Sequence, residues 1–262
     1  MNDLPAPRFL WLFDFDGTLS VIVPDRDAAQ LHPMCRVLLK ELSAMPGNFV
    51  AVLSSRSIED LVSRVPFPGV ILGGASGLEW RLPGGHRVRP GDAAEERRDR
   101  AREAISTQLA RLASFPGLDL EDKGWSVAVH HRHVLPEALA MLEPLLSELR
   151  HTPGVRVFRG PSVAEVQLLA NVSKSFGVRR ICRILGVDPS GGRILYAGDD
   201  ENDAAAMRWL LRKGGIALAV GNRMRLPGAR YVAGPVELVR VVRELAGALP
   251  RADRGKRKTV TG

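Results

Sequence analysis

The sequence predicts an α/β protein with a doubly wound parallel sheet that is interrupted by a smaller inserted α/β domain. Two observations predict this fold. Short apolar runs alternate with helical segments before and after the middle of the chain, which is the pattern of parallel strands joined by helices. The middle segment differs, because its strands alternate apolar and polar residues. We therefore expect residues 1–80 and 170–250 to form a discontinuous core, residues 81–169 an inserted domain, and residues 251–262 a basic disordered tail.

The first core strand leads directly into a pair of acids. Residues 10–13 are a continuous apolar run, as expected of a strand buried on both faces, and the segment DFDGT follows at once. Burying carboxylates at the tip of a core strand is costly unless a cation or a reaction compensates. Gly17 permits a sharp turn that brings Asp14 and Asp16 to one site. An Asx turn or an acidic N-cap is the alternative, but the apolar run directly before the acids favours a catalytic edge.

Two further strands are expected before the inserted domain. Residues 49–53 form the second apolar run, and Ser54 follows it with a hydroxyl that can donate to a phosphate oxygen. Ser57 and Asp60 resemble a capping box that opens a helix over residues 58–65, so we interpret Ser57 as structural. Residues 70–72 predict a third short strand.

The second half of the core also contains an apolar strand that leads directly into acidic residues. Lys174 is expected to begin a helix that ends near residue 185. A lysine there can neutralise a phosphoryl group, although lysines are usually solvated. A strand over residues 193–196 leads into Asp199, Asp200 and Asp203. A helix over 204–211, strands over 215–220 and 231–232, and a helix over 236–245 complete the core, with ligands expected at the carboxyl ends of its strands.

The inserted domain is expected to contain helices and a small sheet. Its helices are predicted over residues 92–114 and 135–149, and its strands over residues 125–132, 155–158 and 163–169, the last two as a hairpin. Alternation puts four polar side chains on one face of this sheet: His130, Arg132, Glu165 and Gln167. That face either binds a polyol or simply meets water, and the alternation alone leaves both interpretations open.

Composition is that of a globular, cytoplasmic protein. The 262 residues are 45% hydrophobic and 25% charged, and no apolar run approaches the length of a membrane span. Cys35 and Cys182 have no CxxC spacing, so neither a disulfide framework nor a cysteine metal site is indicated. We expect no membrane partner, and a monomer is favoured.

The net charge of +8 does not by itself indicate nucleic acid binding. Residues 251–262 hold about half of the excess, and elsewhere the arginines are interspersed with acids on predicted helices, as on solvated faces. A basic surface would still attract an anionic, phosphorylated substrate. We expect a small-molecule partner and no nucleic acid.

Four motifs stand in the order found in the haloacid dehalogenase (HAD) phosphatase superfamily. They are the Asp14/Asp16 pair, Ser54, Lys174 and the acids that begin at Asp199. The chain resembles this superfamily over nearly its whole length except the tail. The resemblance implies a HAD-like Rossmann-type core, and the position of the insert implies a C2-type α/β cap.

The HAD resemblance also implies roles for these residues. Asp14 would be the nucleophile and Asp16 the general acid and base, which splits one hard hydrolysis into two easier steps. Phosphate would be bound by Thr18, Ser54 and Lys174. A Mg²⁺ ion would be held by Asp14, the backbone carbonyl of Asp16, and Asp199, with support from Asp200 and Asp203.

Within the superfamily the chain is similar to the trehalose-6-phosphate phosphatase family. The similarity is carried by VLSSR (52–56), GLE (77–79), EDKGWSVAVHHR (121–132) and VAEVQ (163–167). It implies a phosphoric monoester hydrolase that converts trehalose 6-phosphate to trehalose and phosphate, with a functional link to a trehalose-phosphate synthase. The sugar would be bound by Lys123, His130, Arg132 and Glu165, with Glu79 nearby.

Three departures from the family pattern bear on the substrate. Ser76 stands where the family usually has histidine in GxHGxE, Ser55 replaces the glycine of SGR, and DDENDAAAM, with Asn202, replaces DDxTDE. Another HAD sugar phosphatase, of the sucrose-phosphate or mannosyl-phosphoglycerate type, is therefore the first alternative. A phosphosugar mutase is a second, and a non-catalytic binding module a third, although the intact acids and lysine argue against the last.

Overall fold

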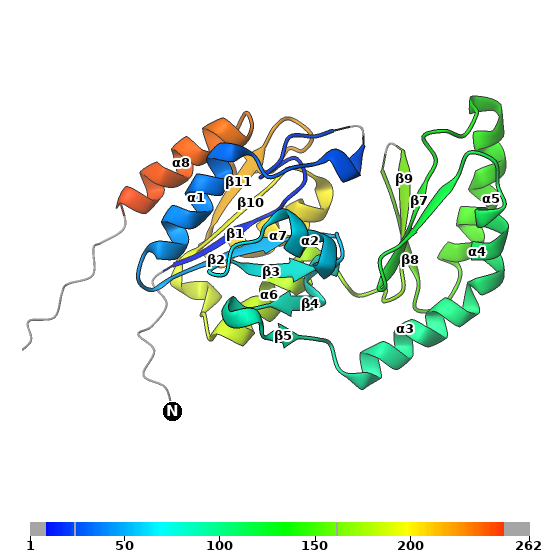
Figure 1. Ribbon diagram of the computed structural model, residues 1–262, viewed down its shortest axis with the longest axis horizontal. Helices are drawn as coiled ribbons and strands as arrows, with labels where there is room; N and C mark the ends of the chain where they lie inside the picture. The colour runs from blue at the N-terminus through cyan, green and yellow to red at the C-terminus, as the bar shows by residue number, and fades with distance from the viewer. Residues whose placement is uncertain (1–8, 24, 161, 249–262) are drawn as a thin grey trace, which may run out of the picture.

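The computed structural model describes residues 9–23, 25–160 and 162–248, so the expected basic tail at residues 251–262 lies outside the described residues. Two units lie side by side along the long axis of the molecule (Figure 1). The larger is built on an eight-stranded sheet and the smaller on a four-stranded sheet.

The larger unit is a doubly wound α/β fold, as predicted. Its sheet has the strand order β12-β11-β10-β1-β2-β3-β4-β5, in which the first six are parallel and β4 and β5 are antiparallel additions. The strands are β1 (Phe9–Phe13), β2 (Asn48–Leu53), β3 (Ile71–Gly74), β4 (Glu79–Arg81), β5 (Arg87–Val88), β10 (Ile194–Gly198), β11 (Ile216–Val220) and β12 (Arg230–Val232).

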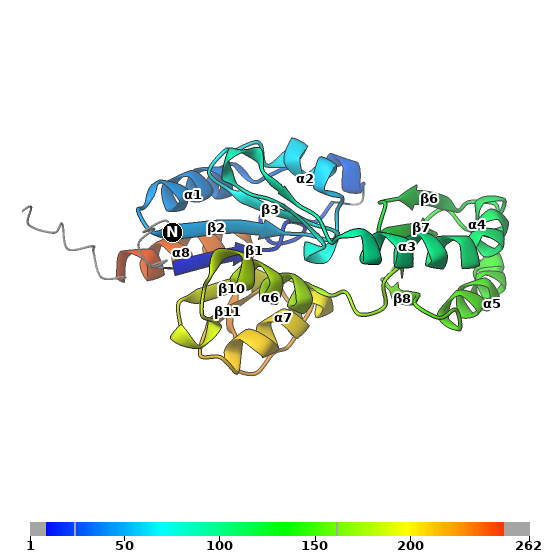
Figure 2. The same cartoon turned by 90° about the horizontal axis from the view of Figure 1, so that it is seen from below.

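Helices cover both faces of this sheet, and Figure 2 shows them on its two sides. One face packs against α1 (Pro33–Ala44), α2 (Ile58–Arg64) and α8 (Pro235–Ala248), and the other against α6 (Lys174–Leu185) and α7 (Glu201–Leu211). β1 is buried on both faces, since Phe9, Trp11 and Phe13 belong to one apolar cluster and Leu10 and Leu12 to the other. This explains why its sequence is apolar without alternation.

The smaller unit places a polar sheet face toward the larger unit. Its strands pair in the order β6-β7-β9-β8, and they are β6 (Asp119–Asp122), β7 (Ser126–His130), β8 (Arg156–Arg159) and β9 (Val163–Gln167). Its helices are α3 (Asp92–Ala104), α4 (Ser106–Ala113) and α5 (Leu139–Arg150). Apolar side chains of α4 and α5 pack on the face that carries Val127, Val129 and Val166, which leaves the opposite face turned to the core (Figures 1 and 2).

Two expected boundaries are wrong. The insert was expected to begin at residue 81, but β5 still pairs with β4 in the larger sheet. Its two residues are too few to show a strand pattern. Residues 92–114 were expected to form one helix, but the chain leaves helical geometry at Ile105 (φ −107°, ψ 8°). Ile105 is fully buried, so the bend turns α4 onto the small sheet while α3 stays largely exposed.

No helix in the described ranges combines the length and apolar character that crossing a membrane requires.

The backbone of α6 packs directly against the backbone of the loop after β3. A Cβ added to Gly177 of α6 would lie 2.5 Å from the Ser76 carbonyl oxygen, and one added to Gly77 would lie 2.3 Å from the Gly177 Cα. Gly77 also has φ +88°, which favours glycine. This close approach fixes the start of α6, and with it Lys174, against the core.

We expect Gly177→Ala to destabilise the protein by about 1–3 kcal/mol, because the new methyl group collides with backbone that cannot move aside. Helix propensity alone would stabilise the variant by about 1 kcal/mol. Gly247 in α8 is the matched control, since an added Cβ meets nothing within 4 Å there. Urea unfolding of both variants tests the contact, and a Gly177→Ala protein that is as stable as Gly247→Ala would contradict it.

Candidate active site

Two acids meet where the parallel sheet reverses its winding. β1 and β10 are neighbouring parallel strands, and Asp14 and Asp199 are the first residues after them. The Asp14 backbone N–H donates to the Ala197 carbonyl at 2.9 Å, which ties the two strand ends together. Both side chains are buried. A crevice at such a switch point is the usual ligand site of an open α/β sheet.

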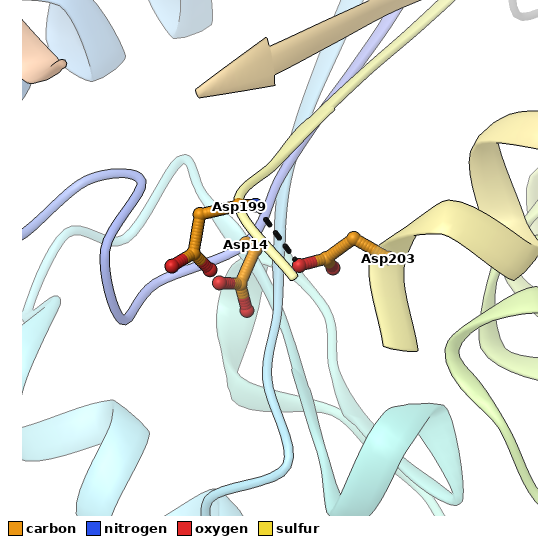
Figure 3. A group of neighbouring side chains, drawn as sticks. All are labelled: Asp14, Asp199 and Asp203. Carbon is orange, nitrogen blue, oxygen red and sulfur yellow. Dashed lines mark hydrogen bonds between the residues drawn. The ribbon is translucent and has the colours of Figure 1, made fainter. Parts of the chain in front are cut away.

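Asp203 is the third acid of the group, and both of its carboxylate oxygens accept hydrogen bonds. One oxygen of each of Asp14, Asp199 and Asp203 lies within 4.8 Å of the others (Figure 3). One Asp203 oxygen accepts from Tyr196 Oη at 2.6 Å and from Lys174 Nζ at 2.6 Å. The other accepts from the backbone N–H of Asp199 at 3.1 Å and of Asp200 at 3.2 Å. Asp203 therefore orders the loop that presents Asp199.

Lys174 links the two halves of the core. Its Nζ donates to Asp14 Oδ1 and to Asp203 Oδ1, both at 2.6 Å, and its side chain is 5% exposed. Burial by itself would lower the pKa of Lys174, but the Asp14 and Asp203 carboxylates outweigh burial and raise it well above its usual range. The lysine is thus a fixed cation at the centre of the acid group.

Asp200 caps the N-terminus of α7. Its carboxylate accepts from the N–H groups of Asn202 at 2.9 Å and Asp203 at 3.1 Å. The Asp203 side chain accepts from the Asp200 N–H in return, which completes a capping box. Asp200 and Asp203, which were expected to support a metal without binding it directly, therefore both stabilise the N-terminus of α7.

The acid group carries more negative charge than one lysine neutralises. Burial, followed by the charge of Asp203, raises the pKa of Asp14 well above its usual range and that of Asp199 to about 7. Carboxylates that are crowded and cut off from water are stabilised by a cation. The donors are all oxygens, which is the set that hard divalent cations prefer. The residues present therefore fit a divalent metal ion.

Asp16 lies beside a partner that the sequence analysis did not identify. Arg56 donates Nε to Asp16 Oδ2 at 2.8 Å and a terminal nitrogen to Oδ1 at 2.7 Å. It also donates to Asp60 at 2.6 Å and to the Arg26 carbonyl at 2.7 Å. The Asp16 side chain is 44% exposed, so solvent reaches its carboxylate. The position of Arg56 just past a strand that already supplied Ser54 was the available signal.

Two of the three predicted phosphate ligands are buried hydroxyl groups that follow β1 and β2. Thr18 Oγ1 is buried and has no hydrogen-bond partner in the described structure, so its hydroxyl is available to a ligand. Ser54 Oγ is buried and accepts from the Arg56 N–H at 3.2 Å, which leaves its proton free to donate. Gly17 (φ +78°) shapes the turn, because a Cβ there would lie 2.2 Å from Asp199 Oδ2.

Three of the expected sugar ligands meet on the polar face of the small sheet. Glu165 accepts from Lys123 Nζ at 2.8 Å and from Ser126 Oγ at 2.5 Å. His130 lies 3.5 Å from Glu121, which also pairs with Arg26 of the larger unit. Burial, followed by the nearby Arg26 and Lys123 charges, lowers the pKa of His130. The face is a charged network directed at the core.

Arg132 and Glu79 lie elsewhere. The expected strand to residue 132 is wrong, because β7 ends at His130 where its partner β9 begins, and Arg132 lies exposed in the following turn. Glu79 is buried at the junction of the two units, where it accepts from Trp125 Nε1 at 2.9 Å and pairs with Arg87 at 3.4 Å. Glu79 thus joins the insert to the core.

Comparison with known proteins identifies relatives of this arrangement. A family model described as trehalose-phosphatase matches residues 12–224. A trehalose-phosphate phosphatase of Mycobacterium bovis is 32% identical over 198 residues, which are 74% of this chain and 49% of that protein. The chain therefore spans about half the length of the curated relatives that it matches.

Solved structures share the fold. The C-terminal domain of a C. albicans trehalose-6-phosphate phosphatase superimposes with a TM-score of 0.72 at 23% identity, covering 94% of each chain. A haloacid dehalogenase-like hydrolase from Bacteroides thetaiotaomicron superimposes with a TM-score of 0.65 at 15% identity, covering 90% of this chain and 99% of that one. The predicted HAD-like fold with an inserted α/β unit is confirmed.

Proposed function

The chain belongs to the trehalose-phosphatase family, and from that premise we propose that it hydrolyses trehalose 6-phosphate to trehalose and inorganic phosphate. The observation that carries the proposal is the buried group of Asp14, Asp199, Asp203 and Lys174 at the switch point of the sheet. A trehalose-phosphate synthase would supply the substrate.

Asp14 is the nucleophile in this proposal. Its carboxylate attacks phosphorus and forms an aspartyl phosphate, while the bond from phosphorus to the sugar oxygen breaks. The Lys174 contact at 2.6 Å supports this role, because the ammonium group opposes the rise in the pKa of Asp14 and directs one of its oxygens. The other oxygen remains for attack.

Asp16 is the general acid and then the general base. It gives its proton to the departing sugar oxygen, and the carboxylate afterwards takes a proton from the water that attacks the aspartyl phosphate. Its exposure to solvent suits both transfers. Arg56 holds the Asp16 carboxylate in position with two hydrogen bonds. One of them must break when Asp16 takes up a proton.

Thr18, Ser54 and Lys174 bind the phosphoryl oxygens. The unpartnered Thr18 hydroxyl and the free Ser54 proton supply donors, and Lys174 supplies charge. We propose Mg²⁺ as the metal, held by Asp14, Asp199 and the backbone carbonyl of Asp16, where it would neutralise the charge that develops on the phosphoryl group.

We propose that the smaller unit is a cap that selects the sugar. Lys123, His130 and Glu165 would bind hydroxyl groups of the disaccharide, while Glu79 and Arg132 would act at the edge of the sugar site. The ion pair between Arg26 and Glu121 supports closure of the cap onto the core. Closure would exclude bulk water during the reaction.

A second candidate function is hydrolysis of another disaccharide phosphate. Ser55 and Ser76 of the core line a small cavity together with Ser126, Glu165 and Gln167 of the insert. These two serines are two of the three departures from the family pattern, so the sugar site differs where core and cap meet. Sucrose phosphate and mannosyl-phosphoglycerate are the substrates to compare.

Phosphate release with Mg²⁺ from trehalose 6-phosphate, sucrose 6-phosphate, glucose 6-phosphate and mannosyl-phosphoglycerate tests the substrate. We expect kcat/KM to be highest for trehalose 6-phosphate. A higher value for another member would retain the chemistry and reject the proposed substrate. Release from none of the four would reject the proposed function.

We expect Arg56→Lys to lower kcat by about 10- to 100-fold, because a lysine cannot make both contacts to Asp16 and the carboxylate loses its position. Arg64→Lys is the matched control, since Arg64 pairs with Asp60 but makes no ion pair or hydrogen bond with Asp16 in the described part of the chain. Steady-state kinetics of the two variants checks this role. Equal kcat values for Arg56→Lys and the unaltered protein would show that Arg56 does not position Asp16.

We expect Glu165→Gln to raise KM by about 10- to 100-fold with little change in kcat, which is the loss of one charge-assisted hydrogen bond in substrate binding. Glu148→Gln on the outer helix of the insert is the control, because Glu148 pairs only with Arg111 in an exposed ion pair among the described residues. A fall in kcat at unchanged KM would place Glu165 in the chemical step and contradict its assignment to the sugar site.

A further inference from the structure

A second, larger cavity lies at the junction of core and insert, and it shares the apolar residues Leu78, Leu169 and Val172 with the small cavity beside the sugar site. Its volume is about 850 Å³, within the range of small-molecule sites. The walls come from both chain segments that connect the two units, at Pro90–Gly91 and 168–172, and from α3 and α6. None of the residues assigned above to catalysis, phosphate, metal or sugar lines it.

The inner wall of this junction cavity is apolar. Leu169, Val172 and Phe176 line it and belong to a small apolar cluster with Trp125. The α3 side presents Ala93 and Ala94, so short side chains leave the space open. A molecule with an apolar body would displace water from these walls and gain the free energy of apolar burial.

The rim of the cavity is cationic. Arg97 and Arg100 of α3 both line it, and neither side chain makes an ion pair or hydrogen bond with another residue in the described part of the chain. Their helix neighbours differ, since Arg98 pairs with Asp99 at 2.7 Å and Arg102 with Asp122 at 2.6 Å. The two rim guanidiniums are thus available to an external anion.

A third arginine is fixed in the wall. Arg180 donates to the carbonyl oxygens of Leu78 and Arg89, so its side chain crosses the junction and holds the connecting segment. Asp92 is the one acid among the described residues that line the cavity. Three guanidiniums against one carboxylate give the rim an excess of positive charge.

We propose that the junction cavity binds a small amphipathic anion, with an apolar body against Leu169, Val172 and Phe176 and its charged group at Arg97 and Arg100. Because both connecting segments form the walls, an occupant would resist a change of angle between α3 and α6. Cap movement would slow, and with it turnover, without competition for the sugar site. The effect on turnover rests on the proposed phosphatase function, whereas the binding does not.

Anilinonaphthalene sulfonate is a suitable probe, because it joins an aromatic body to one anionic group. We expect saturable fluorescence enhancement with one site per chain on the folded protein. The neutral analogue phenylnaphthylamine should bind at least about tenfold more weakly, since each charge-assisted hydrogen bond is worth about that factor or more. Equal affinity of the two probes would overturn the assignment of the rim arginines.

Variants locate the probe. Arg97→Gln combined with Arg100→Gln should weaken binding about tenfold or more, and Ala93→Trp should also weaken it, because the indole would occupy part of the cavity. Arg208→Gln combined with Arg212→Gln, at exposed positions in α7 and directly after it, is the matched control and should leave binding unchanged. If the rim and filling variants bind the probe as tightly as this control, the proposal is wrong.

Kinetics distinguish this cavity from the sugar site. Saturating probe should lower kcat for trehalose 6-phosphate at nearly unchanged KM, and Ala93→Trp should need a higher probe concentration for the same effect. Purely competitive inhibition would place the probe in the active site and reject the proposal. Should the chain hydrolyse none of the sugar phosphates, the fluorescence titrations would still decide the binding claim, so the two failures are separable.

Discussion

Replacing Asp14 with asparagine is expected to lower kcat for sugar phosphate hydrolysis by more than about 10⁴-fold. An amide cannot attack phosphorus, and the loss of a nucleophile exceeds the 10²- to 10⁴-fold that a general acid or base usually contributes. The substitution is nearly isosteric, so Lys174 and the β1 end keep their places. Phosphate release under saturating substrate measures the effect.

Two comparisons make the Asp14 result specific. Circular dichroism and thermal unfolding of Asp14→Asn should match a folded protein, which excludes loss of structure as the cause. Asp188→Asn should retain full activity, because this exposed N-cap precedes the amino end of β10, whereas Asp199 follows the carboxyl end of that strand. Hydrolysis by Asp14→Asn within about tenfold of the unaltered protein would require a different nucleophile.

Lys174→Met is expected to lose both activity and stability. Methionine fills similar space but leaves Asp14 and Asp203 buried without the cation that now lies 2.6 Å from each. Breaking a buried charge pair by removing one partner costs about 3–5 kcal/mol. Phosphate binding loses its fixed charge as well, so kcat/KM should fall by at least about 100-fold.

The stability loss of Lys174→Met has a definite pH dependence. Burial raises the pKa of Asp203 to about 6 in the folded protein, against an ordinary value of 3.8. A carboxyl with a raised folded pKa favours folding at low pH and loses that advantage as the pH rises through the folded value. Without the lysine this pKa rises further, so the deficit should be largest above pH 7 and shrink below about pH 6.

Urea unfolding of metal-free protein across pH measures this deficit. Lys213→Met is the control, because Lys213 is exposed after α7 and its loss should cost little. The double variant Lys174→Met with Asp203→Asn should recover part of the stability but none of the activity. A Lys174→Met protein as stable as Lys213→Met at pH 8 would contradict the buried charge network.

The acid group was predictable because its first acids follow directly after core strands. In a parallel sheet the carboxyl ends of neighbouring strands share one edge, so Asp14 and Asp199 had to lie close once β1 and β10 were recognised as neighbours. The place of Lys174 at the start of a core helix carried weight only together with the other motifs in HAD order, since lysines there are usually solvated. Periodicity likewise placed Glu165 on the polar face of the small sheet.

Contacts that depend on tertiary packing were not predictable. Arg56 reaches Asp16 across 40 positions of sequence, and no periodicity indicates which way a side chain at a strand end turns. The pairing of Trp125 with Glu79 depends on how the insert docks on the core. β5 has only two residues, and the bend at Ile105 follows from docking of α4 rather than from a helix-breaking residue.

The central claim is that Asp14 becomes phosphorylated during hydrolysis of trehalose 6-phosphate, and detection of that phosphoryl group is its most direct test. Protein is quenched in acid during turnover with Mg²⁺, digested, and analysed by mass spectrometry. We predict a phosphoryl group on the peptide that contains Asp14, absent from Asp14→Asn and from protein treated with a chelator. Full turnover without any phosphorylated Asp14, or phosphorylation of a different residue, would contradict the account.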